Sequence, residues 1–520
     1  MSFCILNMRI TLISTATFPS DQGIRTISSV LKKAGHQVKI VFMSYSEDYL
    51  KLYKQNELKQ LLQICKGSGW IGINCYASTA PRAIRITNFL KKSLPQIPLV
   101  WGGIHPTICP ERCIPYTDII CIGEGEEAAI EFSNAIAKGS PIEKIKNLWI
   151  KKENGKIIKN PVRPAIENLD NLPFADYDIR EHFVLENHKI RKFREEDLAG
   201  VIFFLTGRGC PYGCAYCSNN LLNELYKGKC KSIVRWHSSD YIIKCILDLR
   251  KRFKTLNYFD IRDDTFSLRP LNQIKEFCEE YKEQVGLRMK CLGDPKTISE
   301  EKIALLVDAG CTDIIIGIQG GERVNKEIYF RNQTDKNVLD AARIINRHRE
   351  KLTVMYDIIT CNPFEKSEDV LNMINLLRKI PKPYFLSVNN LVFFPGTSLY
   401  ERAKQSPILS KQAEKSWRLN YWDRAKHIRL KKKNMYLVLI LNLMRGSVTK
   451  RRFGAMPNFL INYLINPRRV KYHLKNPTPT HVALFFVGIS DIIRERIAKP
   501  IYRSMPIGFK VWYDKIRYKV

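Results

Sequence analysis

Three cysteines close together in one glycine-containing loop constrain this chain more than any other feature. Cys210, Cys214 and Cys217 follow the β-branched and aromatic run 201–206, which is typical of a strand. Three thiolates at this spacing can converge on one metal centre, and soft thiolate ligands favour zinc or an iron-sulfur cluster. A structural zinc site needs a fourth ligand, and no nearby His or second CxxC pair supplies one. Three cysteines on a four-iron cluster leave one iron open for a substrate or cofactor; three unrelated core cysteines are the alternative.

The other cysteines and the N-terminus indicate a reducing, cytoplasmic setting. Fifteen cysteines, an odd number scattered over 520 residues, are a poor match for a secreted disulfide scaffold. Residues 1–15 have no basic segment ahead of an apolar core, so we expect no signal peptide. The most apolar later run, 435–444, is ten residues long, whereas a membrane-spanning helix needs roughly 20. We therefore expect a cytoplasmic protein, or one that is peripheral at the inner face of the membrane.

Residues 1–145 are predicted to form a doubly wound, flavodoxin-like α/β domain. Short β-branched or aromatic runs alternate with stretches of helical period, and Gly35 occupies a helix C-cap position. Five strands with intervening helices imply a parallel sheet whose ligand lies beyond the carboxyl ends of the strands. The predicted strands are 9–14, 38–43, 70–74, 99–101 and 119–122.

The rest of the chain divides into three predicted segments. Residues 146–198 form a hairpin and a linker, because Asn154 and Gly155 are the preferred pair for a type I′ turn. Residues 199–402 hold six more strands that alternate with helices, which implies a partial (β/α)6 barrel with its chemistry at the C-terminal strand ends. Residues 403–520 are a basic, mainly helical extension. The predicted barrel strands are 201–206, 258–262, 288–292, 313–318, 353–360 and 386–394.

The cysteine loop resembles the signature of the radical S-adenosylmethionine (radical SAM) superfamily, CxxxCxxC after the first strand of a partial barrel. This resemblance, over residues 200–400, implies a 4Fe-4S cluster whose open iron chelates S-adenosylmethionine. An electron from an external donor of the flavodoxin or ferredoxin type would then generate a 5′-deoxyadenosyl radical. Tyr216, just before the last cysteine, is expected near the adenine. Asp263, Asp264 and Gln319, where many relatives have Glu, match the family's cofactor-contacting positions at other strand ends. Arg331 matches a recurrent basic position of the family, which implies a pair with an acidic partner or with the cofactor carboxylate. A capping or turn role fits each of the four equally well.

Glycine-rich loops follow the fourth and fifth predicted strands of the N-terminal domain, and they let the backbone approach a bulky ligand. Together with residues 172–177 they resemble the cobalamin-binding domain that precedes the barrel in one large radical SAM class. The loop after the first strand has no histidine, so we expect that no histidine of this loop ligates cobalt. The alternative is a vestigial domain that binds no ligand. The expected cofactor contacts are Gly102, Gly103, His105, Thr107, Gly123, Glu124 and Gly125, with His105 bonded to backbone or corrin amides.

The resemblance implies an enzyme with a 4Fe-4S cluster, S-adenosylmethionine and cobalamin that C-methylates an unactivated carbon of a small-molecule or lipid-like substrate. A radical is needed because such a C–H bond gives an acid, base or nucleophile nothing to react with, so the cofactors carry the chemistry. Cyclisation or rearrangement by a cobalamin-containing relative is one alternative. A non-catalytic RNA- or membrane-binding protein on a degenerate barrel is another, and the intact cysteine triad argues against it.

The last quarter of the chain is strongly basic. Residues 401–520 hold 27 Lys/Arg and 6 Asp/Glu in a chain whose formal charge is +33. Basic residues mixed with aromatic and aliphatic ones can lie on an anionic membrane surface or contact RNA, which we favour less. A helical cap over the barrel mouth with a solvated basic face is the other interpretation. The basic residues concerned are Lys431, Lys432, Lys433, Arg445, Arg451, Arg452, Arg468, Arg469 and Lys471.

Overall fold

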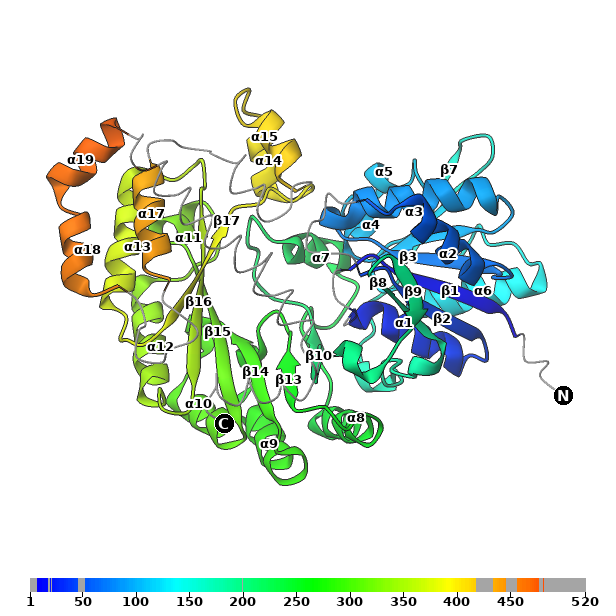
Figure 1. Cartoon of the computed structure of the whole chain (residues 1–520), viewed down its shortest axis with the longest axis horizontal. Helices are drawn as coiled ribbons and strands as arrows, with labels where there is room; N and C mark the ends of the chain where they lie inside the picture. The colour runs from blue at the N-terminus through cyan, green and yellow to red at the C-terminus, as the bar shows by residue number, and fades with distance from the viewer. Residues whose placement is uncertain are drawn as a thin grey trace. The chain divides into compact units, whose positions relative to one another are not determined.

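The computed structural model (Figure 1) describes residues 7–16, 19, 21–44, 52–198, 200–417, 434–445, 456–476 and 480. These residues belong to two compact units. The first comprises the described residues within 1–292, 308–311 and 392–427, and the second comprises those within 293–307, 312–391 and 428–520. The division predicted at residues 145, 198 and 402 remains a prediction. Lys431, Lys432, Lys433, Arg451 and Arg452 lie outside the described residues.

A nine-stranded sheet forms the N-terminal part of the first unit. Its order is β7-β6-β5-β4-β3-β1-β2-β8-β9. The five central strands are parallel, which confirms the predicted doubly wound architecture. Because β1 lies between β2 and β3, the strand order reverses there, and a doubly wound fold binds ligands at such a switch point. The strands are β1 (Arg9–Ser14), β2 (Gln37–Phe42), β3 (Trp70–Asn74), β4 (Leu99–Gly102), β5 (Ile119–Cys121), β6 (Leu148–Lys151), β7 (Ile157–Lys159), β8 (His182–Glu186) and β9 (Lys189–Lys192).

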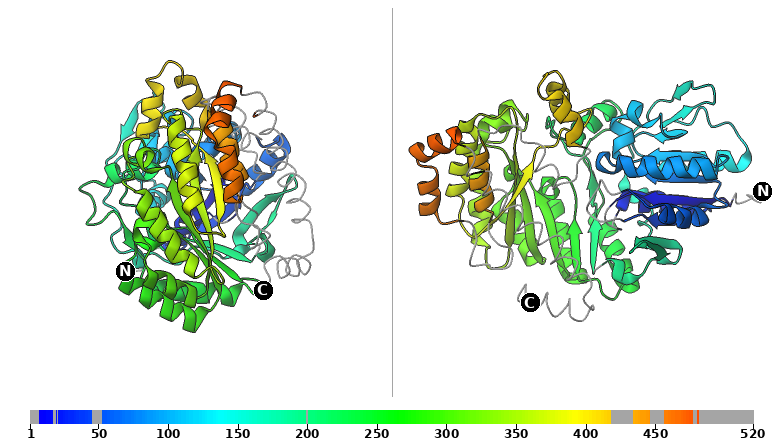
Figure 2. Two further views of the ribbon diagram at one scale, coloured as in Figure 1. Left: turned by 90° about the vertical axis from the view of Figure 1, so that its left-hand side faces the viewer. Right: turned by 45° about the horizontal axis from the view of Figure 1, so that its top comes forward.

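Helices cover both faces of this sheet (Figures 1 and 2). Helix α1 (Gln22–Lys33) packs against α6 (Glu126–Lys138), and α2 (Gln55–Cys65) packs against α3 (Ala80–Ser93) on the opposite face. The apolar residues of the central strands are therefore shielded from both sides, which explains why these strands are almost continuously apolar. Two short helices, α4 (Ile104–Ile108) and α5 (Pro110–Cys113), follow β4.

The predicted hairpin forms, but its turn is not type I′. Strands β6 and β7 are antiparallel, and the backbone N–H of Lys152 donates to the carbonyl of Lys156 at 2.8 Å. Gly155 has a φ of +80°, whereas Asn154 does not have a positive φ. A type I′ turn needs positive φ at both central residues, so the predicted turn type is wrong.

The first unit also holds the start of the predicted partial barrel. Strand β10 (Val201–Phe204) is parallel to β13 (Tyr258–Ile261), which is parallel to β14 (Arg288–Gly293). A small antiparallel ribbon joins β11 (Gly207–Arg208) to β12 (Arg235–Trp236). The helices of this part are α7 (Ser218–Tyr226), α8 (Ser239–Arg252), α9 (Leu271–Glu280), α14 (Ser398–Lys404) and α15 (Ser410–Ser416).

The second unit continues the alternation of strand and helix. Strand β15 (Cys311–Gln319) is parallel to β16 (Thr353–Thr360), and β16 is parallel to β17 (Phe385–Asn390). All six predicted barrel strands are thus present. The helices of this unit are α10 (Glu300–Asp308), α11 (Glu322–Glu327), α12 (Asp335–Arg347), α13 (Ser367–Lys379), α17 (Met435–Leu443), α18 (Asn458–Leu464) and α19 (Pro467–Lys475). Among the residues that the structure describes, none of the helices has the length and apolar character needed to span a membrane.

Candidate active site

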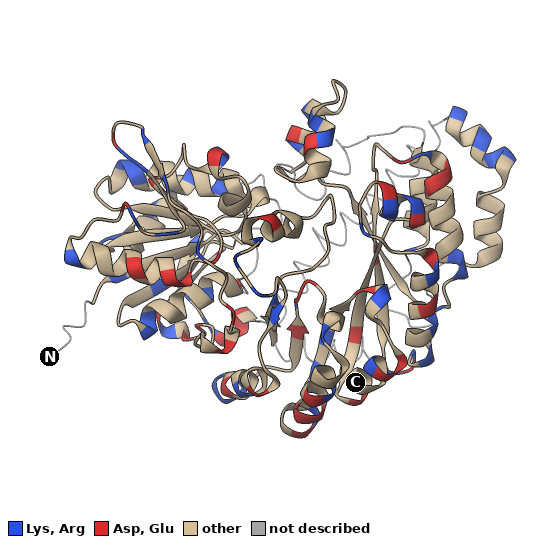
Figure 3. Cartoon of the chain, turned by 180° about the vertical axis from the view of Figure 1, so that it is seen from behind, with Lys and Arg blue, Asp and Glu red and all other residues tan. Residues whose placement is uncertain are grey.

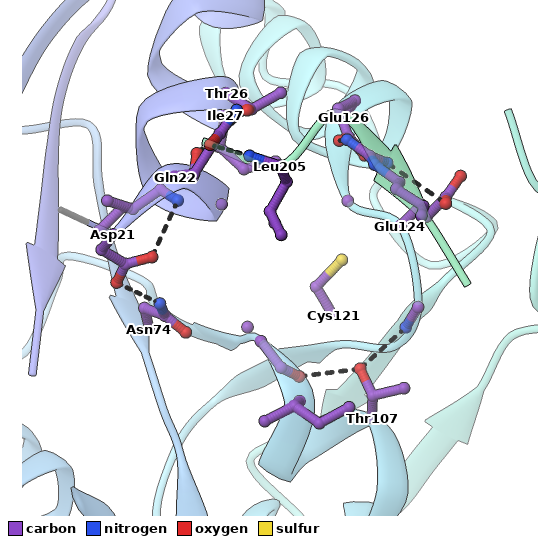
Figure 4. A pocket seen from close by; sticks show the side chains of 18 of the residues that line it. Asp21, Gln22, Thr26, Ile27, Asn74, Thr107, Cys121, Glu124, Glu126 and Leu205 are labelled. Atoms are coloured by element: carbon purple, nitrogen blue, oxygen red, sulfur yellow. Dashed lines mark hydrogen bonds and ion pairs between the residues drawn. The ribbon is translucent and has the colours of Figure 1, made fainter. Parts of the chain in front are cut away.

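A cavity of about 930 Å³ opens at the carboxyl ends of β1, β3, β4 and β5 in the first unit. Its volume is near the upper end of the range for small-molecule and cofactor sites. Residues from the sheet line one side, and residues around the β11–β12 ribbon line the other. Figure 4 shows Asp21, Asn74, Thr107, Cys121 and Glu124 around this space. Six of the seven residues expected at the cofactor from the glycine-rich loops line it: Gly102, Gly103, Thr107, Gly123, Glu124 and Gly125.

Asp21 joins the ends of β1 and β3 at the cavity wall. Its carboxylate accepts hydrogen bonds from the Ser14 hydroxyl at 2.7 Å and from Asn74 Nδ2 at 2.5 Å. It also caps helix α1. A Cβ at Gly103, whose φ is +96°, would lie 2.2 Å from Asn74 Oδ1. Only glycine therefore fits at this position of the loop after β4.

Thr107 joins the two glycine-rich loops. Its hydroxyl donates to the carbonyl of Gly103 at 2.8 Å and accepts from the backbone N–H of Gly123 at 3.0 Å. One short side chain thus holds the loop after β4 against the loop after β5. This explains how residues far apart in sequence border the same space.

Glu124 is the centre of a partly buried ion-pair network. Its carboxylate binds both Nη atoms of Arg235, Nη1 of Arg208 at 3.2 Å and the backbone N–H of Ile166 at 2.8 Å. Burial opposes ionisation, but the hydrogen bonds from Arg235 and the charge of Arg208 outweigh it and hold the pKa of Glu124 below its ordinary value. The Tyr226 hydroxyl accepts from the Glu124 backbone N–H at 2.7 Å. Glu124 is therefore ionised and held in place at the cavity edge.

His105 does not line the cavity, although Ile104 and Thr107 on the same short helix do. Its imidazole packs against the Trp417 ring, with centroids 5.6 Å apart. Burial, reinforced by the charge of Arg112, lowers the pKa of His105 to about 4. The ring is therefore neutral near pH 7. Its expected contact with cobalamin remains a prediction.

The cysteine loop runs between the β11–β12 ribbon and helix α7. Cys210 and Cys214 are buried, and Cys217 is half-buried. A Cβ at Gly209 would lie 2.0 Å from the carbonyl oxygen of Ile233, so this glycine, with a φ of +91°, lets the loop turn closely against the ribbon. Burial, with smaller contributions from Asp264, Cys214 and Cys217, raises the pKa of the Cys210 thiol to about 12. Iron must therefore displace the protons when it binds.

No group of three or more His, Cys, Asp or Glu side chains in the described parts of the chain is gathered as ligands of a single metal ion. A four-iron cluster makes a different demand, because each cysteine binds a different iron. The three cysteines of this loop supply the soft thiolate donors that such a cluster requires. Tyr216, between two of them, is half-buried.

The two aspartates after β13 differ in their surroundings. Asp263 is buried, and it accepts hydrogen bonds from the backbone N–H groups of Thr206 and Gly207 at 2.6 and 3.1 Å. Burial raises its pKa to about 6, although Arg269 and these hydrogen bonds oppose the rise. Asp263 thus holds the start of the cysteine loop. Asp264 has an exposed side chain and lines the cavity.

Gln319 and Arg331 belong to the second unit. Gln319 ends β15 at an irregular register with a φ of +64°. Arg331 donates to Asp294 at 2.6 Å and to the carbonyl of Gly317 at 3.2 Å. Asp294 is thus the acidic partner of Arg331. The contact of Arg331 with the cofactor carboxylate, and the cofactor roles of Tyr216, Asp263, Asp264 and Gln319, remain predictions.

Sequence reasoning missed several residues that line the cavity. Asn74 ends β3 and Asp21 caps helix α1 after the loop that follows β1, where the doubly wound rule could have found them. Arg208 and Arg235 gave no local signal, because their partner Glu124 is far away in sequence. His237 was missed too; it lines the cavity, stacks on Tyr241 with centroids 4.0 Å apart, and has its pKa lowered to about 4 by burial. The missed residues that border the cavity include Asp21, Asn74, Tyr76, Arg208, Tyr226, Arg235, His237 and Tyr241.

Two family descriptions match the chain in tandem. The B12 binding domain family matches residues 8–133, and the radical SAM superfamily matches residues 204–377. The chain belongs to the cobalamin-dependent radical SAM family. The enzyme therefore uses a 4Fe-4S cluster, S-adenosylmethionine and cobalamin. The large glycine-bordered cavity on the B12 binding domain and the three thiols of the radical SAM loop fit these groups.

Three known proteins show what the enzyme is similar to. An uncharacterized methyltransferase of Pyrococcus horikoshii is 27% identical over 344 residues, which cover 65% of this chain and 70% of that protein. The anaerobic magnesium-protoporphyrin IX monomethyl ester cyclase of Synechocystis is 27% identical over 198 residues, 38% of this chain and 37% of that protein. The structure of the radical SAM methyltransferase TsrM from Kitasatospora setae, with cobalamin and a [4Fe-4S] cluster bound, superposes with a TM-score of 0.62 at 16% identity. It covers 76% of this chain and 78% of TsrM, and the likeness concerns the fold.

Proposed function

We propose that the enzyme C-methylates an unactivated carbon of a small-molecule or lipid-like substrate. The observation that supports this most is the composition of the cavity wall. Gly102 and Gly123 of the B12 binding domain share the cavity with Gly207 and Gly209, which lie within three residues of Cys210. A ligand in this cavity therefore lies between the sheet that binds cobalamin in the family and the loop that carries the three cysteines.

The bound cofactors supply a carbon-centred radical from S-adenosylmethionine and a methyl group from cobalamin. The residues of the chain position these groups and limit access of water. Phe203, Leu205 and Leu222 add apolar surface to the cavity, which disfavours water that could quench a radical. Asp21, Thr107 and Glu124 fix the surrounding loops through the hydrogen bonds described above. The methyltransferase named among the relatives supports methylation for this enzyme.

A first experiment tests the cofactor sites. The enzyme is purified without oxygen and reconstituted with iron, sulfide and hydroxocobalamin beside a Cys210→Ala, Cys214→Ala, Cys217→Ala variant. We expect about four irons and one cobalt per chain in the wild type, and loss of iron with cobalt retained in the variant. Iron without cobalt in the wild type would remove cobalamin-dependent methylation, and absence of both would remove the radical reaction altogether.

A second experiment separates methylation from the other candidate reaction. Similarity to a cyclase favours ring formation as the second candidate. The reconstituted enzyme is incubated with a reductant, S-adenosylmethionine carrying a deuterated methyl group, and pooled small metabolites and extracted lipids. Methylation should produce S-adenosylhomocysteine and 5′-deoxyadenosine in equal amounts and place the deuterated methyl group in a product. Production of 5′-deoxyadenosine without S-adenosylhomocysteine would contradict methylation and favour cyclisation. The required external electron donor is expected to be a flavodoxin or ferredoxin.

A further inference from the structure

The hairpin of helices α18 and α19 in the second unit has one anchored face and one exposed face. On the anchored face Ile461 and Val470 are buried. The Tyr436 hydroxyl of α17 donates to the carbonyl of Leu464 at 2.9 Å, and the Tyr436 ring stacks on His473 with centroids 4.2 Å apart. These contacts hold the hairpin on α17, so its other face is presented in a defined orientation.

The exposed face of the hairpin combines large apolar side chains with basic ones. Phe459 is 70% exposed, Tyr463 56% and Tyr472 58%. Such exposure is unusual for large aromatic side chains, and a cluster of them marks an interaction surface. Figure 3 shows Lys and Arg without Asp or Glu along these two helices. The exposed residues that form this surface, called the α18–α19 surface, are Phe459, Leu460, Tyr463, Arg468, Arg469, Lys471, Tyr472 and Lys475.

The stretch of sequence that contains this surface carries charge of one sign. Between Asp423 and Asp491 the chain has fourteen Lys/Arg and no Asp or Glu. A surface that was merely solvated would carry both signs, as the other helices of this unit do through pairs such as Lys336 with Asp340. The composition therefore indicates a partner that is anionic and also accepts hydrocarbon groups.

We propose that the α18–α19 surface binds the headgroup region of an anionic phospholipid bilayer. Phe459 and Leu460 would enter the boundary between headgroups and acyl chains, Tyr463 and Tyr472 would lie at headgroup depth, and the basic side chains would contact lipid phosphates. This inference goes beyond the proposed methylation and does not depend on it.

The same surface suits RNA less well. RNA recognition of this kind stacks bases on open aromatic faces, but the Arg469 guanidinium already lies 3.7 Å from the Tyr463 ring centroid. Leu460 offers a base neither a stacking plane nor a hydrogen bond. The boundary between headgroups and acyl chains accommodates both the Arg469–Tyr463 contact and the leucine side chain. The side chains of this surface therefore fit a bilayer better than RNA.

The test is flotation of the full reconstituted enzyme with vesicles of phosphatidylcholine alone or mixed with phosphatidylglycerol. We expect binding to the mixed vesicles only. Each basic residue near an anionic surface contributes about a fivefold gain in binding. The triple variant Arg468→Ala, Arg469→Ala, Lys471→Ala should therefore bind mixed vesicles roughly a hundredfold more weakly. The double variant Phe459→Ala, Tyr472→Ala should lose the part of the binding that persists at raised salt.

The matched control neutralises three exposed lysines of the first unit, Lys66→Ala, Lys251→Ala, Lys254→Ala, and should bind as the wild type does. Iron and cobalt contents and thermal unfolding verify that each variant is folded. Absence of wild-type binding to mixed vesicles at low salt would overturn the proposal. Equal losses of vesicle binding in the control and in the Arg468→Ala, Arg469→Ala, Lys471→Ala variant would also overturn it. The same holds if a single-stranded RNA oligonucleotide displaces the vesicles from the wild type but binds that triple variant much more weakly.

Discussion

The carboxylate of Glu124 accepts hydrogen bonds from both Nη atoms of Arg235, at 2.8 and 3.2 Å. The two residues are 111 positions apart, one in the loop after β5 and the other in the ribbon beside the cysteine loop. Their side chains are only 14% and 8% exposed. This pair therefore ties the glycine-rich loop of the B12 binding domain to the β11–β12 ribbon, whose first strand leads into the cysteines.

The Glu124→Gln variant should be less stable and bind cobalamin less tightly. The substitution removes the only carboxylate that is shown paired with Arg235, whereas Arg208 keeps its ion pair with Glu126 at 2.6 Å. Breaking such a partly buried pair should lower the free energy of unfolding by about 2 kcal/mol. Urea denaturation of the cofactor-free protein measures this change, and cobalt content after reconstitution measures the effect on the site.

A control for this variant is Glu143→Gln, which breaks an exposed pair with Lys152. Exposed pairs are screened by water, so we expect almost no change in stability. Equal effects of the two substitutions would mean that the burial of the Glu124 pair has no energetic importance.

The stability of the cofactor-free protein should rise between about pH 4 and pH 6.5, in part because of His105. Its pKa is lowered to about 4 in the fold, against about 6.5 in an unfolded chain. Between these values the unfolded state binds more protons, so the free energy of unfolding increases with pH there. We expect His105 alone to contribute roughly 2 kcal/mol of difference between pH 5 and pH 7.

Urea titrations at several pH values check this prediction on the His105→Phe variant, whose slope of stability against pH should be smaller. Trp417→Phe is the matched control, because it alters the ring packed on His105 and leaves the titrating group in place. An unchanged slope in His105→Phe would contradict the assigned neutral, buried state of the imidazole.

Substitution of Gly103 by alanine should damage the cavity. The added Cβ would lie 2.2 Å from Asn74 Oδ1, at a φ of +96° that alanine adopts only with strain. We expect a loss of about 2 kcal/mol or more in unfolding free energy and a lower cobalt content. Gly102→Ala is the control for stability, because a Cβ there meets nothing within 4 Å. Equal thermal stability of the two variants would show that the close approach to Asn74 is not strained.

Local sequence patterns were sufficient for the elements and for most of the motif assignments. Strand 353–360 was predicted at its observed bounds, because an alternating or continuous apolar run between polar segments has few other conformations. The cysteine spacing indicated the chemistry of the loop for a similar reason, since soft ligands close in sequence are close in space. The turn at Asn154 and Gly155 was assigned wrongly, because turn type depends on both strands of the hairpin as well as on the two central residues.

The sequence by itself determined which elements form, which loop carries the thiols and which domain bears glycine-rich strand ends, because these features depend on neighbours along the chain. Only the tertiary structure decided that Thr107 bridges the two glycine-rich loops, that Glu124 is paired with Arg208 and Arg235, and that His105 is packed against Trp417. Each of these contacts joins residues that are distant in sequence. Their energies come from burial and charge in three dimensions, and such terms leave no periodic or local signature in the chain.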